Sequence, residues 1–348
     1  MSQPASDPRA AREAYYRRIA EQHLTPLWEV LSALVPEKPQ SPCVPAIWRY
    51  DALRPWLMES GRLISAQEAV RRVLILENPG LPGSSAITQS LYAGLQLILP
   101  GEVAPSHRHT QSALRLIVEG SGAYTAVEGE RALMHPGDFI ITPSWTWHDH
   151  GNEASGPVVW LDGLDIPLVR FFDCGFAENY PQASQPVARP EGDALGRYGN
   201  NLLPVDYEPA SLSSPVFAYP YVRTRESLAL LQRNGAPHPA HGYKMQFINP
   251  ATGGYAMPTM AAFVQLLPAG SSGSGYRSTD AAVFHVIEGG GNVLIGDTRI
   301  DFAARDTFVV PAWSAYRLQA QAECVLFSFS DRPVQRAMGL WREQTLPA

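Results

Sequence analysis

The sequence predicts an all-β fold of two tandem antiparallel barrels of the jelly-roll type, with a few peripheral helices. The first observation is composition: 31 Pro and 28 Gly separate short runs rich in Val, Ile, Leu and Phe, which is typical of many strands joined by tight turns. The second is an internal repeat, because residues 97–148 are similar to residues 266–316. The 348 residues suffice for two domains. One small barrel per copy would close the sheet edges.

Composition and charge exclude several classes of protein. With 45% apolar and 17% charged residues, the chain is neither disordered nor a coiled coil. The net charge of −6 and the lack of a basic run argue against nucleic acid as a partner. We find no apolar stretch of about 18 residues and no signal peptide, so we expect a cytoplasmic protein outside the membrane. Cys43, Cys174 and Cys324 are widely spaced and indicate no disulfide framework.

Helical patterns lie outside the two repeated segments. Ser65 and Glu68 form a capping box before the apolar pattern AQEAVRRVLIL, and Asn234-Gly235 ends a later helical pattern. Residues 175–220 are rich in Pro, Gly, Ser and Asn without periodicity, which indicates a long linker or arm. The full set of helical patterns is residues 8–35, the stretch after Ser65, residues 224–234 and residues 332–343.

Three histidines in the first copy have the spacing of a metal site. In a strand, residues two apart point to one face, so His107 and His109 can both point into the barrel, and His148 on a later strand can complete the set. The surrounding Gly and Pro positions, GEVAPSHRH and GDFIITPSWTWHDHGN, resemble the two motifs of the cupin barrel. A single His on an apolar strand is usually a core residue, but three at this spacing favour a borderline divalent metal such as iron, manganese or zinc.

The ligand set differs from the usual cupin motif at one position and is missing from the second copy. The motif usually has a Glu four residues after the second His, where this chain has Ala113, so a six-coordinate metal would keep up to three open positions for substrate and dioxygen. The second copy has Tyr276, Ser278 and Tyr316 where the first has histidines, which is no credible set for a divalent ion. We expect one metal per chain.

These observations divide the chain into four parts. The predicted parts are a helical arm and cap (1–75), a first, metal-binding cupin barrel (76–174), a linker with a helix (175–240) and a second, metal-free cupin barrel with a C-terminal helix (241–348).

A narrower resemblance covers about residue 25 to the C-terminus. SLYAGLQLILPGEVAPSHRHTQSALRLIVEG, GDFIITPSWTWHDHGN and FSFSDRPVQRAMGLWRE resemble the gentisate 1,2-dioxygenase family, which is related to salicylate and 1-hydroxy-2-naphthoate dioxygenases. The resemblance implies a bicupin enzyme with one iron(II) per chain. It implies that both atoms of dioxygen enter the ring of a small aromatic hydroxy acid, which opens between the carboxylate-bearing and adjacent hydroxyl-bearing carbons; gentisate would give maleylpyruvate. It also suggests a homotetramer.

Two arginines are candidates to bind the substrate carboxylate. Arg115 lies six residues after His109, so in one regular strand its guanidinium would face the barrel interior. Arg71 is the second candidate by resemblance; we expect it on the capped helix before the barrel, where its neighbour Arg72 is easily confused with it.

The resemblance adds five further residues. His150, two residues past His148, would exchange a proton near the phenol or dioxygen. Gln96 and Asp162 match family positions that line or brace the pocket, and Asp162 could orient a His ring. Tyr92 resembles the gentisate type, since salicylate-cleaving members have Trp there, and Gly94 leaves space that an alanine would fill.

Other functions remain open from sequence alone. The same cleavage could act on salicylate, a 5-substituted salicylate or 1-hydroxy-2-naphthoate. Another metal-dependent cupin enzyme would usually retain the Glu that Ala113 replaces. A non-enzymatic storage or ligand-binding cupin would typically lack the three histidines. No motif assigns a role to His135, His238, His241 or the cysteines.

Overall fold

The computed structural model describes residues 7–347, in two compact units divided between Gln40 and Ser41. The first unit contains α1 (Pro8–Ala20) and α2 (Leu27–Leu34). The Asp7 side chain caps α1, and Trp28 Nε1 donates to the Tyr16 hydroxyl (2.8 Å), which ties the two helices together. The expected helical region therefore consists of two helices with a break between them.

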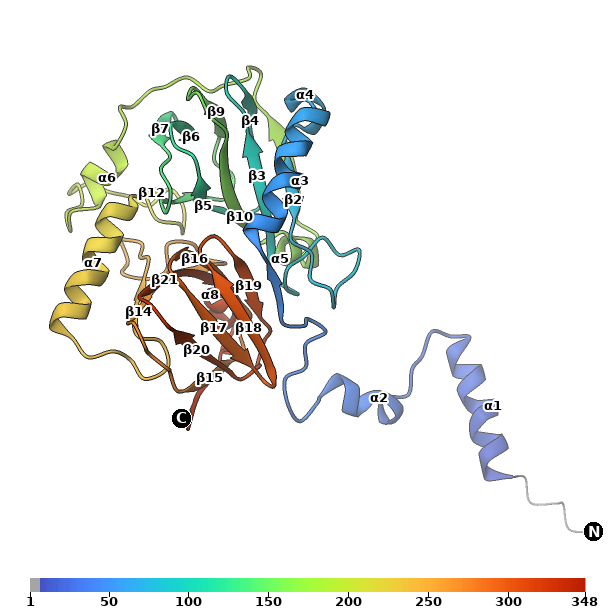
Figure 1. Cartoon of the computed structure of the whole chain (residues 1–348). Helices are drawn as coiled ribbons and strands as arrows, with labels where there is room; N and C mark the ends of the chain where they lie inside the picture. The colour runs from blue at the N-terminus through green and yellow to red at the C-terminus, as the bar shows by residue number, and fades with distance from the viewer. Residues whose placement is uncertain (1–6, 348) are drawn as a thin grey trace, which may run out of the picture. The chain divides into compact units, whose positions relative to one another are not determined.

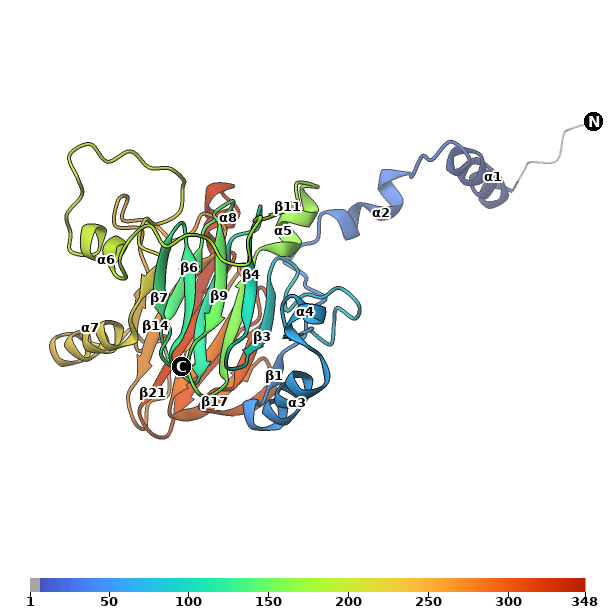
Figure 2. The same cartoon turned by 90° about the horizontal axis from the view of Figure 1, so that it is seen from above.

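The second unit consists of two barrels, each made of two facing antiparallel sheets (Figures 1 and 2). The first barrel's six-stranded sheet has the order β12 (Ala218–Tyr219), β8 (Phe139–Thr142), β5 (Ala113–Glu119), β10 (Val158–Leu164), β3 (Tyr92–Ile98), β2 (Val73–Ile75). Its five-stranded sheet has the order β11 (Ala177–Asn179), β4 (Val103–His109), β9 (His148–Asn152), β6 (Ala123–Val127), β7 (Glu130–Leu133).

The second barrel repeats this arrangement. Its six-stranded sheet has the order β1 (Ala46–Trp48), β19 (Thr307–Val310), β16 (Ala282–Glu288), β21 (Cys324–Ser330), β14 (Ala261–Leu267), β13 (Tyr243–Gln246). Its five-stranded sheet has the order β18 (Thr298–Ala303), β17 (Gly290–Ile295), β20 (Tyr316–Ala320), β15 (Gly275–Ser278), β22 (Glu343–Leu346). The prediction of two tandem antiparallel barrels is confirmed.

The main hydrophobic core joins the two barrels through their six-stranded sheets. Phe139 of the first barrel packs on Phe327 of the second with ring centroids 5.3 Å apart, and both are fully buried. At Gly163 a Cβ atom would lie 2.8 Å from the Phe329 ring, so glycine is what allows the sheets to approach so closely. The strands in this core are buried on both faces because each sheet has a barrel interior on one side and the other barrel on the opposite side.

The two barrels also exchange strands. The short strand β1 precedes the first barrel but pairs with β19 of the second, and β12 precedes the second barrel but pairs with β8 of the first. Each exchanged strand leads directly into a helix, α3 (Tyr50–Leu63) or α7 (Tyr221–Asn234). The duplication therefore includes a strand and a helix before each barrel.

The same ionic contact fastens each of these helices to a barrel. In α3, the Tyr50 hydroxyl donates to Glu119 (2.8 Å) and Arg54 Nε donates to the same carboxylate (2.7 Å). In α7, spaced identically, the equivalent residues are Tyr221, Arg225 and Glu288. Sequence patterning missed α3, which contains Pro55, although the shared Tyr-x-x-x-Arg spacing was a usable signal.

Three predicted helices have different bounds in the structure. The capping box of Ser65 and Glu68 is confirmed, but its helix α4 (Ala66–Ala69) ends where Val70 has φ 55°, and the following apolar residues form β2. The C-terminal pattern is a short helix α8 (Arg332–Ala337) followed by β22, and α7 begins three residues before the predicted start. The predicted linker contains β11, α6 (Asp193–Tyr198) and β12, while α5 (Ile166–Phe171) follows β10.

Across residues 7–347, none of the helices has both the length and the apolar character needed to span a bilayer.

Candidate metal and substrate site

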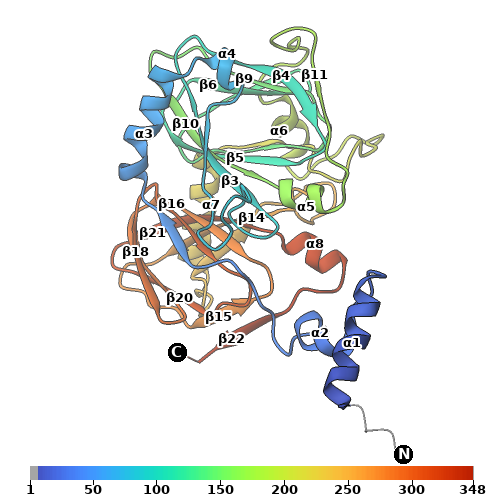
Figure 3. The same ribbon diagram turned by 90° about the vertical axis from the view of Figure 1, so that its right-hand side faces the viewer.

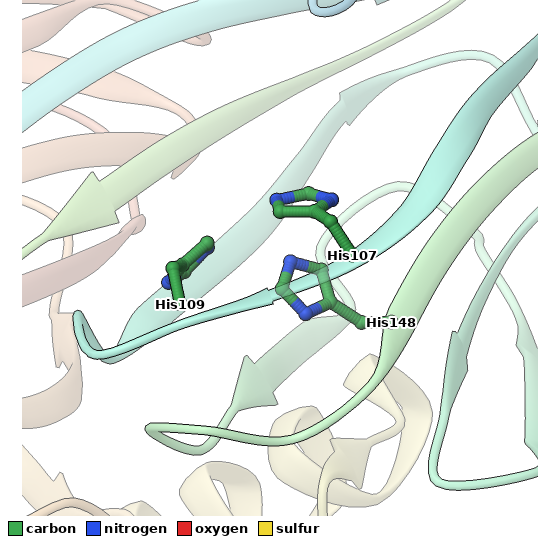
Figure 4. A group of neighbouring side chains, drawn as sticks. All are labelled: His107, His109 and His148. Carbon is green, nitrogen blue, oxygen red and sulfur yellow. The ribbon is translucent and has the colours of Figure 1, made fainter. Parts of the chain in front are cut away.

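Three imidazoles converge on the inner face of the first barrel's five-stranded sheet (Figure 4). His107 and His109 lie on β4, and His148 lies directly opposite His107 in the β4–β9 register. The ring centroids are 4.3 to 5.1 Å apart, and one nitrogen from each ring lies within 4.8 Å of the others. The structure thus brings together the three predicted ligands.

The hydrogen bonds of these rings leave one nitrogen of each directed to a common point. The Nδ1 atoms lie 3.2, 2.8 and 2.9 Å from the carbonyls of Pro105, Gln111 and Thr146. A carbonyl can only accept, so Nδ1 of His109 and of His148 carries the proton and their Nε2 atoms keep the lone pair. His107 Nδ1 also contacts the Arg71 guanidinium, which can only donate, so its two contacts do not fix the tautomer of this ring. Among the described residues, nothing hydrogen-bonds the buried His148 Nε2. This donor set fits a divalent metal.

The electrostatics of the site keep the imidazoles neutral, as metal ligands must be. Burial, and then the Arg71 guanidinium, lower the pKa of His107 to about 3. Burial lowers the pKa of His109 to about 4 and holds that of His148 well below its ordinary value.

The six-stranded sheet forms the opposite wall and carries the charged groups. Arg115 on β5 and Gly94 on β3 both lie directly opposite Asp162 on β10, so the three share one row and face the imidazoles. Arg115 is 4% exposed; Nη1 donates to the Thr142 hydroxyl, and Nε lies 3.4 Å from Asp162 Oδ1. The prediction that Arg115 continues the His109 strand is wrong, because the chain turns before β5; Arg115 is nevertheless buried in the site, on the facing sheet.

Asp162 contacts Arg115 and Trp160 rather than a histidine. Its Oδ1 accepts from Trp160 Nε1 at 3.0 Å, and among the described residues it makes no hydrogen bond to a His ring. The expectation that Asp162 orients an imidazole is therefore wrong, because the histidines sit on the other sheet. Burial raises the pKa of Asp162 to about 6, with Arg115 opposing the shift.

Arg71 reaches the metal ligands and Arg72 does not. Arg71 Nη2 donates to the Pro105 carbonyl (2.7 Å) and contacts His107 Nδ1. Burial, and then the charge of Arg115, lower the pKa of Arg71 to about 10. Arg72 turns away to form an ion pair with Glu102 (2.7 Å). Arg71 lies after α4 rather than on it, because the helix ends at Ala69.

His150 has one free nitrogen inside the barrel. The Thr125 hydroxyl donates its proton to Met134 Sδ (3.3 Å). The Thr125 oxygen therefore acts as the acceptor for His150 Nδ1–H, at 2.9 Å. His150 Nε2 is then an acceptor, and it is fully buried with no hydrogen-bond partner among the described residues. Burial and then Arg115 lower the pKa of His150 well below its usual value.

Tyr92, Gly94 and Gln96 occupy one face of β3, as the sequence predicts, and Gln96 is buried opposite Trp160. The space expected at Gly94 is already filled. A Cβ there would lie 2.5 Å from Val73 Cγ1 and 3.0 Å from the Tyr92 hydroxyl oxygen. Sequence patterning placed Val73 in a helix and so missed that β2 covers this position.

Comparison with known proteins identifies the family. Residues 94–164 match the family model described as Cupin domain. The chain is 55% identical to a gentisate 1,2-dioxygenase of Aquipseudomonas alcaligenes, over 95% of this chain and 96% of that protein. It is 39% identical to a gentisate 1,2-dioxygenase of Streptomyces, over 94% and 93%. The structure of a salicylate 1,2-dioxygenase of Pseudoaminobacter salicylatoxidans with gentisate is 34% identical, with a TM-score of 0.91 over 99% of this chain and 95% of that one.

The chain belongs to the gentisate 1,2-dioxygenase family. It is accordingly a bicupin, ring-cleaving dioxygenase, and the predictions of fold, family and enzyme class are confirmed.

Several residues of this dioxygenase site were not found from sequence. Thr142, Thr125 and Trp160 hold Arg115, His150 and Asp162, respectively. Trp160 was detectable, because it lies two residues before Asp162 in a strand and therefore on the same face. The two threonines come from strands adjacent to those of the residues that they hold, which only the sheet register reveals.

The second barrel keeps the strand pairing of the site without its metal ligands. Tyr276 and Tyr316 are direct partners in the β15–β20 register, as His107 and His148 are in the first barrel. Within residues 7–347, the three histidines are the only cluster of His, Cys, Asp or Glu side chains with metal-ligand spacing.

Proposed function

We propose that this enzyme is an iron(II)-dependent gentisate 1,2-dioxygenase that opens the ring between the carboxylate-bearing and adjacent hydroxyl-bearing carbons to give maleylpyruvate. The observation that carries the proposal is the charge of the site. Three neutral imidazoles face two guanidiniums, of Arg71 and Arg115, and a single carboxyl, of Asp162. An anionic chelating ligand would balance this excess of positive charge.

His107, His109 and His148 would hold the metal, one ion per chain. When bound, iron(II) supplies the electrons that make dioxygen reactive toward an aromatic ring. Ala113, where cupins usually have a ligating Glu, is fully buried and leaves this side of the triad without a protein carboxylate. Three protein ligands suit an iron that must also accept two substrate oxygens.

The side chains around the triad would orient the substrate. Arg71 and Arg115 bind its carboxylate, and Tyr92 with Gln96 lines the ring pocket. His150 accepts a hydrogen bond from the phenol at Nε2, the one ring nitrogen that Thr125 leaves free. Asp162 positions Arg115 through the 3.4 Å contact at Nε.

Gentisate is favoured over other substrates because the 55% identical relative is a gentisate 1,2-dioxygenase. The alternative is the same cleavage of salicylate, a 5-substituted salicylate or 1-hydroxy-2-naphthoate, which the gentisate-bound salicylate 1,2-dioxygenase keeps open. The test is oxygen uptake after anaerobic loading with iron(II), run with these four substrate types at equal concentration. We expect the highest kcat/KM for gentisate and one oxygen consumed per ring opened. A higher kcat/KM for salicylate would refute the substrate assignment, and no uptake with any of them would refute the function.

We further propose a homotetramer. The arm helix α2 leaves Trp28 65% exposed and Leu34 65% exposed, an apolar surface suited to contact with another subunit. Light scattering of the purified protein tests the assembly, and a monomer mass would refute it.

A further inference from the structure

The second barrel contains an unusual lysine. The chain has only two lysines among its 27 basic residues, Lys38 and Lys244, and all the others are arginine. Lys244 lies on β13 opposite Gln265 of β14, which is fully buried. Directly opposite residues point to the same face of a sheet, so the lysine side chain shares the face of Gln265.

The amine of Lys244 has no polar partner. Within residues 7–347, no carboxylate lies within ion-pair distance of Nζ, and no hydrogen bond involves it. Lys244 Nζ lies over the Phe263 ring, 4.6 Å from its centroid. The Arg332 guanidinium lies 5.1 Å from the same centroid, so two cations share one aromatic ring.

The charged groups around Lys244 are paired with residues other than the lysine. Asp280 binds Arg332 (3.1 Å) and Trp341, and Glu343 accepts from the Tyr276 hydroxyl (2.6 Å). His241, in the loop before β13, packs edge-on against Tyr276, and burial lowers its pKa to about 2. Asp280 follows β15, Glu343 lies on β22 and Arg332 lies on α8; Figure 3 labels these three elements.

Desolvation and a neighbouring cation both favour the neutral amine. Burial, and then Arg332, lower the pKa of Lys244 to about 7, with Asp280 and Glu343 opposing the shift. A lysine in this environment is a nucleophile near neutral pH, because its lone pair is free. The Lys244 residue keeps some solvent exposure, which is the route by which a small molecule would reach it.

We propose that Lys244 is a nucleophilic amine of the second barrel that condenses with small 2-oxo acids. Nζ adds to the carbonyl carbon, the carbonyl oxygen leaves as water, and a carbon–nitrogen double bond joins the acid to the lysine. Arg332, whose Nε is held by Asp280, faces the carboxylate of the acid with the N–H groups that Asp280 leaves free. The metal-free barrel would thus bind a carbonyl compound covalently and reversibly, and this inference does not rest on the function proposed for the first barrel.

The test is reductive trapping with glyoxylate as the probe. The folded protein is treated with glyoxylate and cyanoborohydride at pH 7, and peptide mass mapping measures modification at each lysine. Half of an amine with pKa about 7 is unprotonated at that pH, against about 1 in 2500 for an ordinary lysine. Lower basicity offsets part of this advantage, so we expect Lys244 to react at least about tenfold faster than Lys38.

Matched controls come from the chain itself. Lys38→Arg leaves Lys244 as the sole lysine and should retain the fast reaction, while Lys244→Arg should abolish it. The unfolded chain should label both lysines equally. The Lys244 rate should level off above about pH 7. Equal or slower labelling of Lys244 in the folded protein would overturn the proposal.

A second probe, propanal, lacks a carboxylate and should show a smaller preference for Lys244 than glyoxylate does. An equal preference would show that Arg332 does not bind the carboxylate of the acid.

Discussion

Two adjacent arginines give the sharpest test of the substrate site. Arg71 contacts His107, whereas Arg72, its chain neighbour, forms an ion pair with Glu102. Replacing either with Met removes one guanidinium and keeps an apolar stem of similar length. Only Arg71→Met should weaken substrate binding.

The magnitude follows from the contacts. A charge-assisted hydrogen bond to a carboxylate contributes about 2–3 kcal/mol when one partner is buried, which corresponds to an affinity loss of about 30- to 150-fold. For Arg72→Met we expect a change in substrate affinity below about twofold. That variant should instead lose about 1–3 kcal/mol of unfolding free energy, because Glu102 is left without its cation.

The assay is an anaerobic titration of the metal-loaded variants with gentisate, with metal content and urea unfolding measured on the same samples. Arg71→Met should keep its metal and lose affinity. Equal losses of affinity in the two variants would refute the assignment of Arg71, and so would loss of metal from Arg71→Met.

Three further predictions concern single positions. His148→Ala should lower metal affinity by more than about 100-fold, since loss of an outer partner alone costs 10- to 100-fold; full metal content by elemental analysis would show that the ligands are misassigned. Gly94→Ala should destabilise the protein by about 1–3 kcal/mol, and adding Val73→Ala should restore most of this in urea unfolding; no rescue would disprove the packing conflict. Glu119→Gln should cost about 1–3 kcal/mol at pH 7. Because the Arg54 hydrogen bond lowers the pKa of Glu119, this difference should be full above about pH 4.3 and vanish as pH falls through the lower folded pKa; a pH-independent difference would argue against the ion pair.

Sequence reasoning performs well where a pattern is local. The spacing of His107, His109 and His148 is set by strand periodicity and by motif glycines, so the triad could be found without a structure. The duplication fixed the architecture because two copies of one pattern must form two copies of one barrel. The capping box at Ser65 was also correct, since its hydrogen bonds span only three residues.

The predictions that failed depend on contacts between distant segments. Val73 and its neighbours have helical periodicity, but pairing with β3 makes them a strand. Arg115 shares strand parity with His109 by coincidence, because a turn separates β4 from β5. Asp162 accepts a hydrogen bond from Trp160 and forms an ion pair with Arg115, because the two walls of the barrel carry different groups, metal ligands on one and charged side chains on the other. Only the register between strands reveals which side chains lie side by side across a sheet.

The most direct test of the account is the location and number of iron ions. Anomalous diffraction from crystals grown anaerobically with iron(II) should show one ion per chain, bound by His107, His109 and His148 with no protein carboxylate among its ligands. An ion in the second barrel, a fourth protein ligand, or an empty triad in crystals that retain activity would contradict it.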